Sequence, residues 1–355
     1  DIDEQLNIQN TKAMHVSNIE RAIVLVILLI NETLSFSYVG VARKFPAESA
    51  TRVRSRPSVR APEGFVAPQP KPLSIPEGEG QIGSLFSGTI ALALRLATGA
   101  FVLGWKIDSL SYQNDGDYSL RLGPLSLRDS SSILPDAPRP AVPLVLYEYE
   151  SSPYCRIVRE TMNLLDITYE CRPCPGARRG FSDELASLTE GRRTVPYLID
   201  PNAGRAMFES SDQIEFLLDM YGPPPDSYDG KALWPIRFQQ FAFFTSAFAA
   251  VARGMPASQP DKLARPDNTE MLPLKLWGYE CSPFVRPVRE RMCELCLPHI
   301  IVSCSRGSAN RDVMVKKTGR FQVPYLEDPN TGIEMFESNE ICKYLDTVYT
   351  TKENL

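Results

Sequence analysis

The chain of 355 residues is 43% hydrophobic and 23% charged, which is typical of a soluble globular protein and leaves room for two domains of ordinary size. A formal net charge of -5, with no basic and aromatic stripe, argues against a nucleic-acid-binding protein. Two histidines, His15 and His299, are too few for a histidine-rich metal site or a Ser-His-Asp triad, and eight cysteines are too few for a disulfide scaffold.

Residues 1–60 are predicted to be a targeting presequence. After Met14 and Arg21 come nine apolar residues at 22–30, a length that fits the hydrophobic region of a signal peptide. The segment at 41–64 is rich in Arg, Ser and Ala, like an organellar transit peptide. Together they resemble the bipartite presequences of algae with secondary plastids, which implies a plastid (chloroplast) location, with thylakoid association as one option. The alternative is a disordered N-terminus that includes translated leader sequence.

Residues 61–140 are predicted to form an apolar helix and a linker. The apolar stretch at 85–105 is nearly long enough to span a bilayer, but Arg95 at its centre would cost about 2.5 kcal/mol or more in lipid. We therefore predict a helix packed on the domain or on a membrane surface, with a true span as the alternative. The alternating pattern at 118–129 predicts a short strand or hairpin, and a linker follows at 129–143.

The remainder of the chain repeats itself, with the domains predicted at 141–222 and 271–350. Pro153 and Pro283 differ by 130 positions (283 − 153), and Pro196 and Pro324 by 128 (324 − 196). Four blocks recur in the same order, among them "YESSPYCRIVRE" against "YECSPFVRPVRE" and "TVPYLIDPNAG" against "QVPYLEDPNTG". Such spacing indicates two duplicated domains and excludes a short-period solenoid.

Each repeat predicts the order β-α-β-α-β-β-α. Apolar, β-rich runs at 144–149 and 274–279 are followed by Ser-Pro, a combination that caps and opens a helix. Second strands are expected at 167–171 and 299–303, helices near 181–191 and 311–319, and a strand begins at each Val-Pro. Asp-Pro-Asn-x-Gly turns the last hairpin, and the final helix begins at Ser210 or Ser338. The first β-α-β unit requires a right-handed crossover and a parallel strand pair.

The segment 223–270 between the repeats is predicted to be a linker helix. Its apolar stretch fits one helix, and Phe238, Phe241, Phe244 and Phe248 suit a role in packing the two repeats together.

The motifs resemble those of the glutaredoxin and glutathione S-transferase N-terminal domains, which share the α/β thioredoxin-like fold. "SPYC" is similar to glutaredoxin's Cys-Pro-Tyr-Cys with serine in the first position, "VPYL" to the cis-proline strand, and "FES" to the Glu-Ser pair that holds the γ-glutamyl carboxylate of glutathione. Over 143–349 the chain resembles the tandem glutathione S-transferase N-terminal-domain proteins of plants, algae and bacteria. The cofactor implied by this resemblance is glutathione.

The reactive position of the family falls on Ser152 in repeat 1 and Ser282 in repeat 2. A serine there is expected to donate a hydrogen bond to the thiolate of glutathione, as in serine-type transferases. Cys155, three residues further on, is the second candidate for catalysis, although it occupies the more buried position of the motif. Cys281 is either a displaced nucleophile at the pocket mouth or an incidental thiol, and a helix N-terminus would activate a cysteine placed there.

The predicted glutathione pocket combines three turns in each repeat. The backbone of Val195 or Val323, before a cis-proline, is expected to pair with the cysteinyl backbone of glutathione. Helix-capping serines are expected to bind a carboxylate. The proposed binding residues are Tyr154, Val195, Pro196, Glu209, Ser210, Ser282, Val323, Pro324, Glu337 and Ser338, with Asp212 and Glu340 as candidates for the γ-glutamyl ammonium group. The basic residues Arg192, Arg193 and Arg320 either hold the glycyl carboxylate or form a solvated face.

The C-x-x-C pairs at 171–174 and 293–296 have zinc-site spacing but lie in different repeats, so incidental buried thiols are the favoured interpretation. Two functional hypotheses remain. The first is a glutathione-dependent thiol transferase or oxidoreductase of weak or degenerate activity that uses Ser152 or Cys155. The second is a non-catalytic scaffold or regulatory protein, associated with the plastid membrane, that uses its thioredoxin folds to bind a partner protein.

Overall fold

The computed structural model describes residues 43–44, 59–70, 93–111, 120–122, 125–176 and 179–351. The signal-like stretch at 22–30 and residues 41–42 and 45–58 of the transit-like segment lie outside the described residues, as does the first part of the apolar stretch, 85–92. The structure therefore bears on the two repeats, on the segment between them and on part of the region that precedes them.

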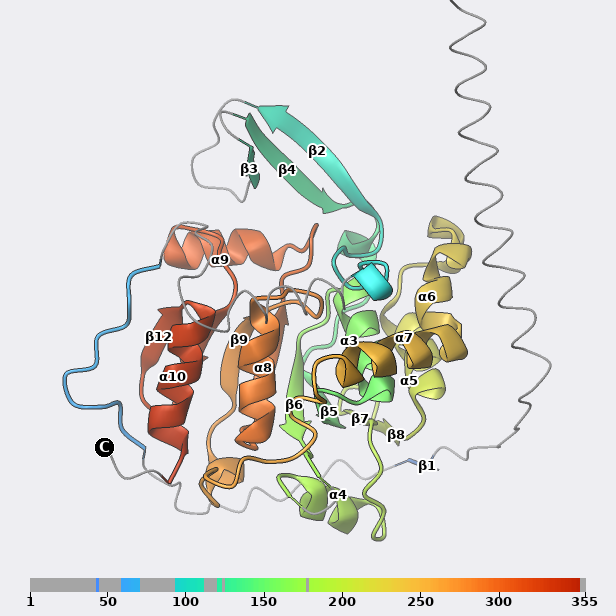
Figure 1. Cartoon of the computed structure of the whole chain (residues 1–355). Coiled ribbons are helices and arrows are strands. Elements are labelled where there is room, and N and C mark those ends of the chain that lie inside the picture. Colours follow the sequence, from blue (N-terminus) through green and yellow to red (C-terminus); the bar gives the residue numbers. More distant parts are fainter. Residues whose placement is uncertain are drawn as a thin grey trace, which may run out of the picture. The chain divides into compact units, whose positions relative to one another are not determined.

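Both repeats have the predicted order β-α-β-α-β-β-α (Figure 1). The elements of repeat 1 are β5 (Leu144–Glu148), α3 (Pro153–Leu164), β6 (Tyr169–Pro173), α4 (Ser182–Leu188), β7 (Tyr197–Asp200), β8 (Arg205–Met207) and α5 (Ser210–Tyr221). Those of repeat 2 are β9 (Leu274–Gly278), α8 (Val285–Glu294), β10 (His299–Ser303), α9 (Asn310–Thr318), β11 (Tyr325–Asp328), β12 (Ile333–Phe336) and α10 (Ser338–Tyr349). The parallel pairs β5–β6 and β9–β10 and the antiparallel hairpins β7–β8 and β11–β12 confirm the thioredoxin-like fold.

Alternation along the strands separates the core into layers. Leu144 and Leu146 of β5 belong to the main apolar core beneath α3 and α5, whereas Tyr147 packs in a smaller cluster with Leu185 of α4. Because successive strand residues point to opposite faces, α3 and α5 cover one face of the sheet and α4 the other. Repeat 2 follows the same pattern, with α8 and α10 over the main core and α9 over a second small cluster.

The strand β6 begins two residues later than predicted. The amide of Ile167 donates to the Met162 carbonyl oxygen at 2.8 Å and Asp166 has φ 54°, so these residues form the turn that ends α3. Extended structure can begin only after that turn is complete, and β6 consequently runs from Tyr169 to Pro173.

The two repeats share one nine-stranded sheet with the order β1-β8-β7-β5-β6-β10-β9-β11-β12. The edge strands β6 and β10 pair antiparallel at its centre, with His299 opposite Cys171 and Ile301 opposite Tyr169. The short strand β1 (Arg43–Lys44) extends the outer edge of repeat 1 by pairing with β8. Pairing β6 with β10 removes an exposed edge from each repeat and brings the N-terminal ends of α3 and α8 toward a common interface.

The region before repeat 1 forms a three-stranded antiparallel sheet from β2 (Trp105–Ser111), β4 (Leu125–Ser131) and β3 (Leu120–Leu122), in the spatial order β2-β4-β3. The predicted hairpin is thus confirmed as β3–β4. Arg95 from the apolar stretch is fully buried against α3 and the linker, where it pairs with Glu160. Within the described ranges, no helix is long and apolar enough to cross a bilayer.

The prediction of a single linker helix is wrong, because the segment forms α6 (Trp234–Arg237) and α7 (Gln239–Val251), which are separated at Phe238. Phe244 and Phe248 are 56% and 61% exposed, so they do not pack the repeats together. Instead α7 buries Ala242, Ser246 and Ala249. Their spacing places them on one face, and their small side chains allow α7 to approach α3 closely. The remaining short 3-10 turns are Leu134–Asp136, Pro225–Ser227, Gly230–Leu233 and Asn268–Glu270.

Candidate functional site

The serines of the two Ser-Pro turns are buried, and each accepts a hydrogen bond from an amide at the start of the following helix. Ser152 is the N-cap of α3, as predicted, whereas α8 begins only at Val285, so Ser282 lies before its cap position. Ser152 Oγ accepts a hydrogen bond from the amide of Cys155 at 3.3 Å, and Ser282 Oγ accepts one from the amide of Val285 at the same distance. Their exposed fractions are 2% and 1%. This hydrogen bond therefore uses one acceptor position of each hydroxyl, and neither hydroxyl reaches open solvent.

Cys155 does not have the surroundings of an activated nucleophile. Its side chain is fully buried, and burial, followed by the nearby Glu148 carboxylate, raises the pKa of its thiol to about 12. Its position in the first turn of α3 does not offset these two effects. Cys281 is likewise buried rather than at a pocket mouth, and burial together with Glu280 raises the pKa of its thiol to about 12.

The two turns predicted to hold glutathione have the expected backbone geometry in both repeats. The Val195–Pro196 and Val323–Pro324 peptide bonds are cis. Glu209 and Glu337, directly before α5 and α10, have φ values of 62° and 73°, an uncommon conformation for residues other than glycine. This conformation turns the chain so that the helix begins at the next residue, the predicted carboxylate-binding serine.

In repeat 1 the cis-proline turn and the Glu-Ser turn are joined by one buried side chain. Gln213 Nε2 donates to the carbonyl oxygens of Pro196 at 3.1 Å and Met207 at 3.0 Å. Repeat 2 has Ile341 at the corresponding position (213 + 128), which offers no such donor. The turns of repeat 2 are connected differently, because Gln322 Nε2 donates to Glu337 Oε1 at 2.8 Å.

The basic residues around these turns already have partners. Arg192 pairs with Glu209 at 3.0 Å and lies 3.9 Å above the centre of the Phe208 ring, and Arg193 pairs with Asp183 at 2.9 Å. All of these charges are substantially exposed, so their ion pairs exchange readily with water. In repeat 2, Arg320 donates to the Pro70 carbonyl oxygen at 3.4 Å.

Tyr154, a predicted binding residue, points outward from the first turn of α3. It is 46% exposed, and its ring centre lies 5.1 Å from that of Phe243 in α7. The linker helix therefore lies beside the Ser-Pro turn of repeat 1. Asp212, in the first turn of α5, is exposed and contacts Ser211.

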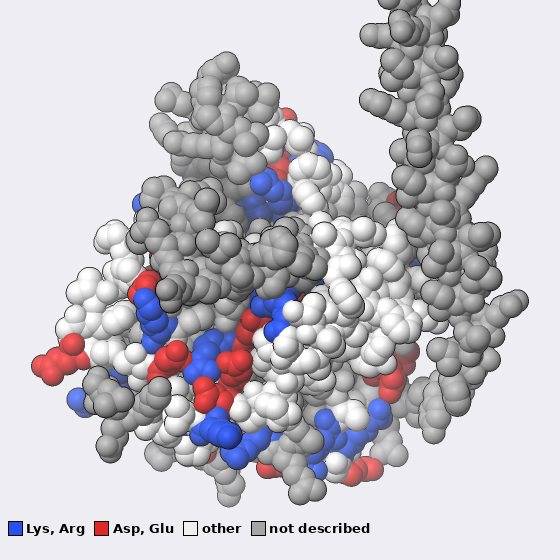
Figure 2. All heavy atoms as spheres, viewed as in Figure 1, with Lys and Arg blue, Asp and Glu red and all other residues white. Residues whose placement is uncertain are grey.

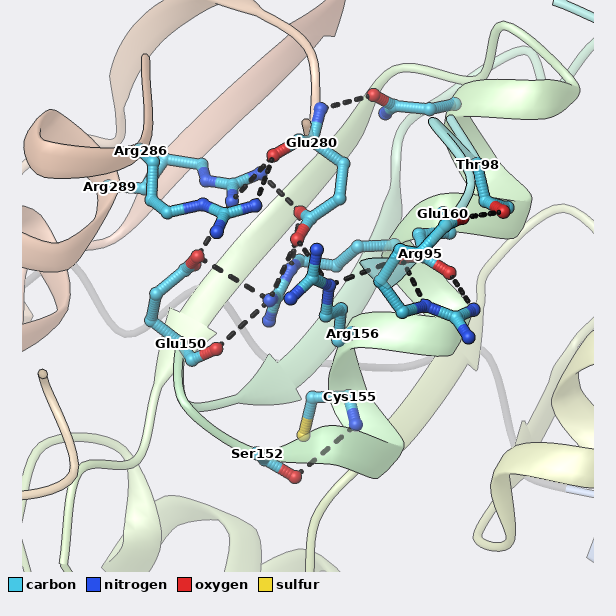
Figure 3. A network of polar contacts seen from close by, with 12 residues as sticks. Arg95, Thr98, Glu150, Ser152, Cys155, Arg156, Glu160, Glu280, Arg286 and Arg289 are labelled. Atoms are coloured by element: carbon cyan, nitrogen blue, oxygen red, sulfur yellow. Dashed lines mark hydrogen bonds and ion pairs between the residues drawn. The ribbon is translucent and has the colours of Figure 1, made fainter. Parts of the chain in front are cut away.

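The repeated Arg-x-x-Arg-Glu segments face each other in a buried network of ion pairs (Figure 3). Arg159 of α3 donates to Glu280 of repeat 2 at 2.8 Å, and Arg289 of α8 donates to Glu150 of repeat 1 at 2.6 Å. Arg159 also contacts Glu150 at 3.5 Å, and Arg289 also bonds to Glu280. These four side chains are at most 6% exposed. Each arginine contacts the glutamate of its own repeat and that of the other repeat, so the network has approximate two-fold symmetry.

The same interface contains further buried arginines. Arg156 contacts Glu160 at 3.1 Å, and Glu160 also accepts hydrogen bonds from Arg95 at 2.5 and 3.0 Å. On the side of repeat 2, Arg253 from the end of the linker binds both carboxylate oxygens of Glu290. The sequence showed the duplication of this motif without indicating its role. The sequence pattern that could have indicated this network is the joint recurrence, in both repeats, of a glutamate before the Ser-Pro and an Arg-x-x-Arg-Glu after it.

The two C-x-x-C pairs come from different repeats, with Cys171 in β6 and Cys293 in α8. Cys171 Sγ donates to Glu148 Oε1 at 3.1 Å, and Cys293 Sγ donates to the Ala257 carbonyl oxygen at 3.7 Å. Burial raises the pKa of all four thiols, Cys171, Cys174, Cys293 and Cys296. In the part of the chain that the structure describes, no three His, Cys, Asp or Glu side chains are arranged to hold a metal ion.

The chain has matches among known protein families and solved structures. The family model of the glutathione S-transferase N-terminal domain matches the chain twice, over residues 146–225 and 276–353. Among solved structures, the chain is similar to TDR1, a trimeric glutathione transferase from Leishmania, with 16% identity over 60% of this chain and 68% of that chain and a TM-score of 0.23. No curated protein matches the chain. The two family matches coincide with the two structural repeats.

Proposed function

Because the chain carries two tandem glutathione S-transferase N-terminal domains, we propose that it binds glutathione in repeat 1 through backbone and carboxylate contacts, without a thiolate of its own. The observation that carries this proposal is the pair of turns joined by Gln213, one with a cis-proline and one with Glu209 at positive φ. Repeat 1 is favoured over repeat 2 because only there does one buried amide hold both turns.

The proposed contacts follow from the groups that these turns present. The backbone at Val195 pairs with the cysteinyl unit of glutathione in the manner of an added strand. Ser210 and the first amides of α5 receive the γ-glutamyl carboxylate, because the positive end of a twelve-residue helix favours an anion. Arg192 and Arg193 receive the glycyl carboxylate by exchanging their exposed ion pairs.

The sulfur of glutathione is not activated in this proposal. With a pKa of about 12, the Cys155 thiol is ionised to roughly one part in 10⁵ at pH 7, which opposes its attack on a disulfide. The buried cap Ser152 is also poorly placed to donate to a thiolate that approaches from solvent. We therefore expect the thiol-transferase activity to be weak or absent.

Calorimetry with matched ligands tests this proposal. S-methylglutathione should bind as tightly as glutathione because the sulfur is not a contact, whereas cysteinylglycine should bind more weakly because it lacks the γ-glutamyl carboxylate. Ser210→Ala should weaken glutathione binding by roughly tenfold through the loss of one charge-assisted hydrogen bond. The matched Ser338→Ala variant should leave affinity unchanged. Absence of glutathione binding to the wild-type protein would refute the proposal.

The second candidate function is a scaffold whose thioredoxin folds bind a partner protein. The specific observation in its favour is that the serine at the reactive position of each repeat is buried and hydrogen bonded to a backbone amide, while the interface between the repeats is extensively hydrogen bonded. Reduction of hydroxyethyl disulfide in the presence of glutathione distinguishes this candidate from an enzyme. Activity that is lost in Cys155→Ser or in Ser152→Ala would support the enzyme, and activity that is absent, or unchanged in both variants, would support the scaffold.

A further inference from the structure

The interface between the repeats contains more positive than negative groups at its buried and largely buried positions. Its arginines are Arg95, Arg156, Arg159, Arg253, Arg286 and Arg289, and its glutamates are Glu148, Glu150, Glu160, Glu280 and Glu290. With every glutamate ionised, six positive charges face five negative charges, which leaves an excess of one. A buried charge without a counter-ion is strongly unfavourable. The excess positive charge arises at a single arginine.

Arg286 is the arginine without a carboxylate partner. Its counterpart in repeat 1, Arg156, binds the glutamate one helical turn further on, but in repeat 2 that glutamate, Glu290, is occupied by Arg253. Among the described residues, the Arg286 guanidinium makes one hydrogen bond, to the Glu280 carbonyl oxygen at 3.4 Å. Its Nε has no partner, although the residue is only 3% exposed.

Arg286 nevertheless remains charged at neutral pH. Burial and then the neighbouring Arg156 guanidinium lower the pKa of Arg286 to about 10, which still leaves it protonated at pH 7. Figure 3 shows Arg286 and Arg289 on one side of Glu280 and Arg156 on the other. The carboxylate of Glu280 is already used by Arg159 and Arg289, so it does not neutralise Arg286.

A small cavity lies where the unpaired donors meet. It measures about 20 Å³, and both Arg156 and Arg286 line it. Four of the residues that line it each have a buried polar atom with no hydrogen-bond partner within the described chain: Arg156 Nη2, Arg286 Nε, Ser151 Oγ and Ser246 Oγ. The glutamates that also line the cavity, Glu150, Glu280 and Glu290, are each held by another arginine.

From these observations we infer that the cavity between the repeats binds one monovalent anion of the size of chloride. One excess positive charge requires one negative charge, and the unpaired guanidinium and hydroxyl groups are all able to donate to it. The cavity of about 20 Å³ is small, which favours a single-atom anion such as chloride over phosphate with its four oxygens. Ser152, the cap of α3, also lines the cavity, so the positive end of this helix adds to the attraction.

Bound chloride stabilises the docked repeats, because it neutralises Arg286 where α3, α7 and α8 meet. This inference is independent of glutathione binding, which uses turns that do not line the cavity. It predicts that the stability of the protein depends on the identity of the anion, and not only on ionic strength.

Thermal unfolding of the full chain tests the inference. Sodium chloride replaces sodium gluconate at constant ionic strength, since gluconate is too large for the cavity. The wild-type Tm should rise with chloride and saturate, with a total shift of roughly 4 °C or more. Arg286→Met should remove this dependence and should be at least as stable as the wild type in gluconate, because it removes the uncompensated charge. The matched Arg193→Met variant, at an exposed ion pair, should keep the full chloride response.

Two further measurements keep the inference falsifiable if Arg286→Met does not fold. Ser246→Ala should raise the chloride concentration needed for half of the Tm shift, since it removes one donor without changing the charge. Crystals grown in bromide should show an anomalous peak between Arg156 and Arg286. Equal Tm values in chloride and gluconate, or a peak-free cavity that contains only water, would overturn the inference.

Discussion

The substitution Glu280→Gln tests whether the buried ion pairs hold the two repeats together. Glu280 accepts hydrogen bonds from Arg159 at 2.8 and 3.2 Å and from Arg289, and its side chain is 1% exposed. Glutamine has nearly the same shape but carries no charge, and it replaces one acceptor oxygen with a donor. The variant thus leaves two arginines facing an amide across the interface.

The expected cost follows from burial. Removing one partner of a buried ion pair typically costs about 3–5 kcal/mol, because the other charge remains uncompensated. Glutamine keeps one acceptor, so we expect the lower end of this range, about 3 kcal/mol. For a domain of this size, the Tm should then fall by roughly 6–12 °C. An exposed pair such as Arg192–Glu209 contributes roughly 0.2–1 kcal/mol, so Glu209→Gln is the matched control.

The pH dependence gives a second measure of the same carboxylate. Burial alone would raise the pKa of Glu280, but attraction by Arg159 and Arg289 outweighs burial and holds the pKa well below its usual range. Its stabilising effect is therefore complete above the unfolded-state pKa of about 4.3 and is lost as the pH falls. Glu280→Gln should accordingly lose less stability than the wild type on acidification.

Urea unfolding and differential scanning calorimetry measure these differences. A double-mutant cycle with Arg159→Met isolates the contact between the repeats, and we expect the double variant to be less destabilised than the sum of the single variants. A Glu280→Gln variant with the stability of Glu209→Gln would refute the reasoning, because the network would then contribute no more than an exposed ion pair.

Three other predictions concern single buried residues. Burial lowers the pKa of His299 to about 4, so its neutral form is favoured in the fold, and stability should be lost as the pH falls from about 6.5 to 4. His299→Asn keeps a donor for the Leu297 carbonyl oxygen. Over this pH range the unfolding free energy of the variant should change by roughly 3 kcal/mol less than that of the wild type. Equal changes in the two proteins would contradict this prediction. Gln213→Ile should destabilise the protein by about 1–3 kcal/mol in urea unfolding and should weaken glutathione binding. An unchanged urea midpoint would show that the two turns of repeat 1 do not need the hydrogen bonds of Gln213. Cys155 should resist iodoacetamide at pH 7 and react after unfolding, as peptide mass mapping would show, and rapid labelling of the native protein would disprove its burial.

The charged residues on one face of the molecule are of both signs. Figure 2 shows Lys and Arg interspersed with Asp and Glu on the face in view. Beside them lies a broad uncharged area. Mixed charge of this kind accords with the formal net charge of -5.

The order of elements within each repeat was predictable from the sequence because it depends on local patterns. Ser152 before Pro153 specifies a helix start, and the repeat itself confirmed each pattern by showing it twice. The cis state of Pro196 and Pro324 and the start of the last helix at Ser210 and Ser338 were also anticipated from short motifs.

What only the tertiary structure decided depends on contacts between residues far apart in the chain. Arg159 and Glu280 are 121 positions apart, and they meet because β6 pairs with β10, a choice of edge that no local pattern specifies. Tertiary packing also buries Cys155, so a predicted nucleophile is instead a buried thiol with a raised pKa. Arg95, which looked costly in an apolar stretch, is neutralised by Glu160 from repeat 1. The local sequence thus determined the fold of each repeat. The ion pairs between the repeats were determined by the tertiary structure, which brings together charged residues that are far apart in the chain.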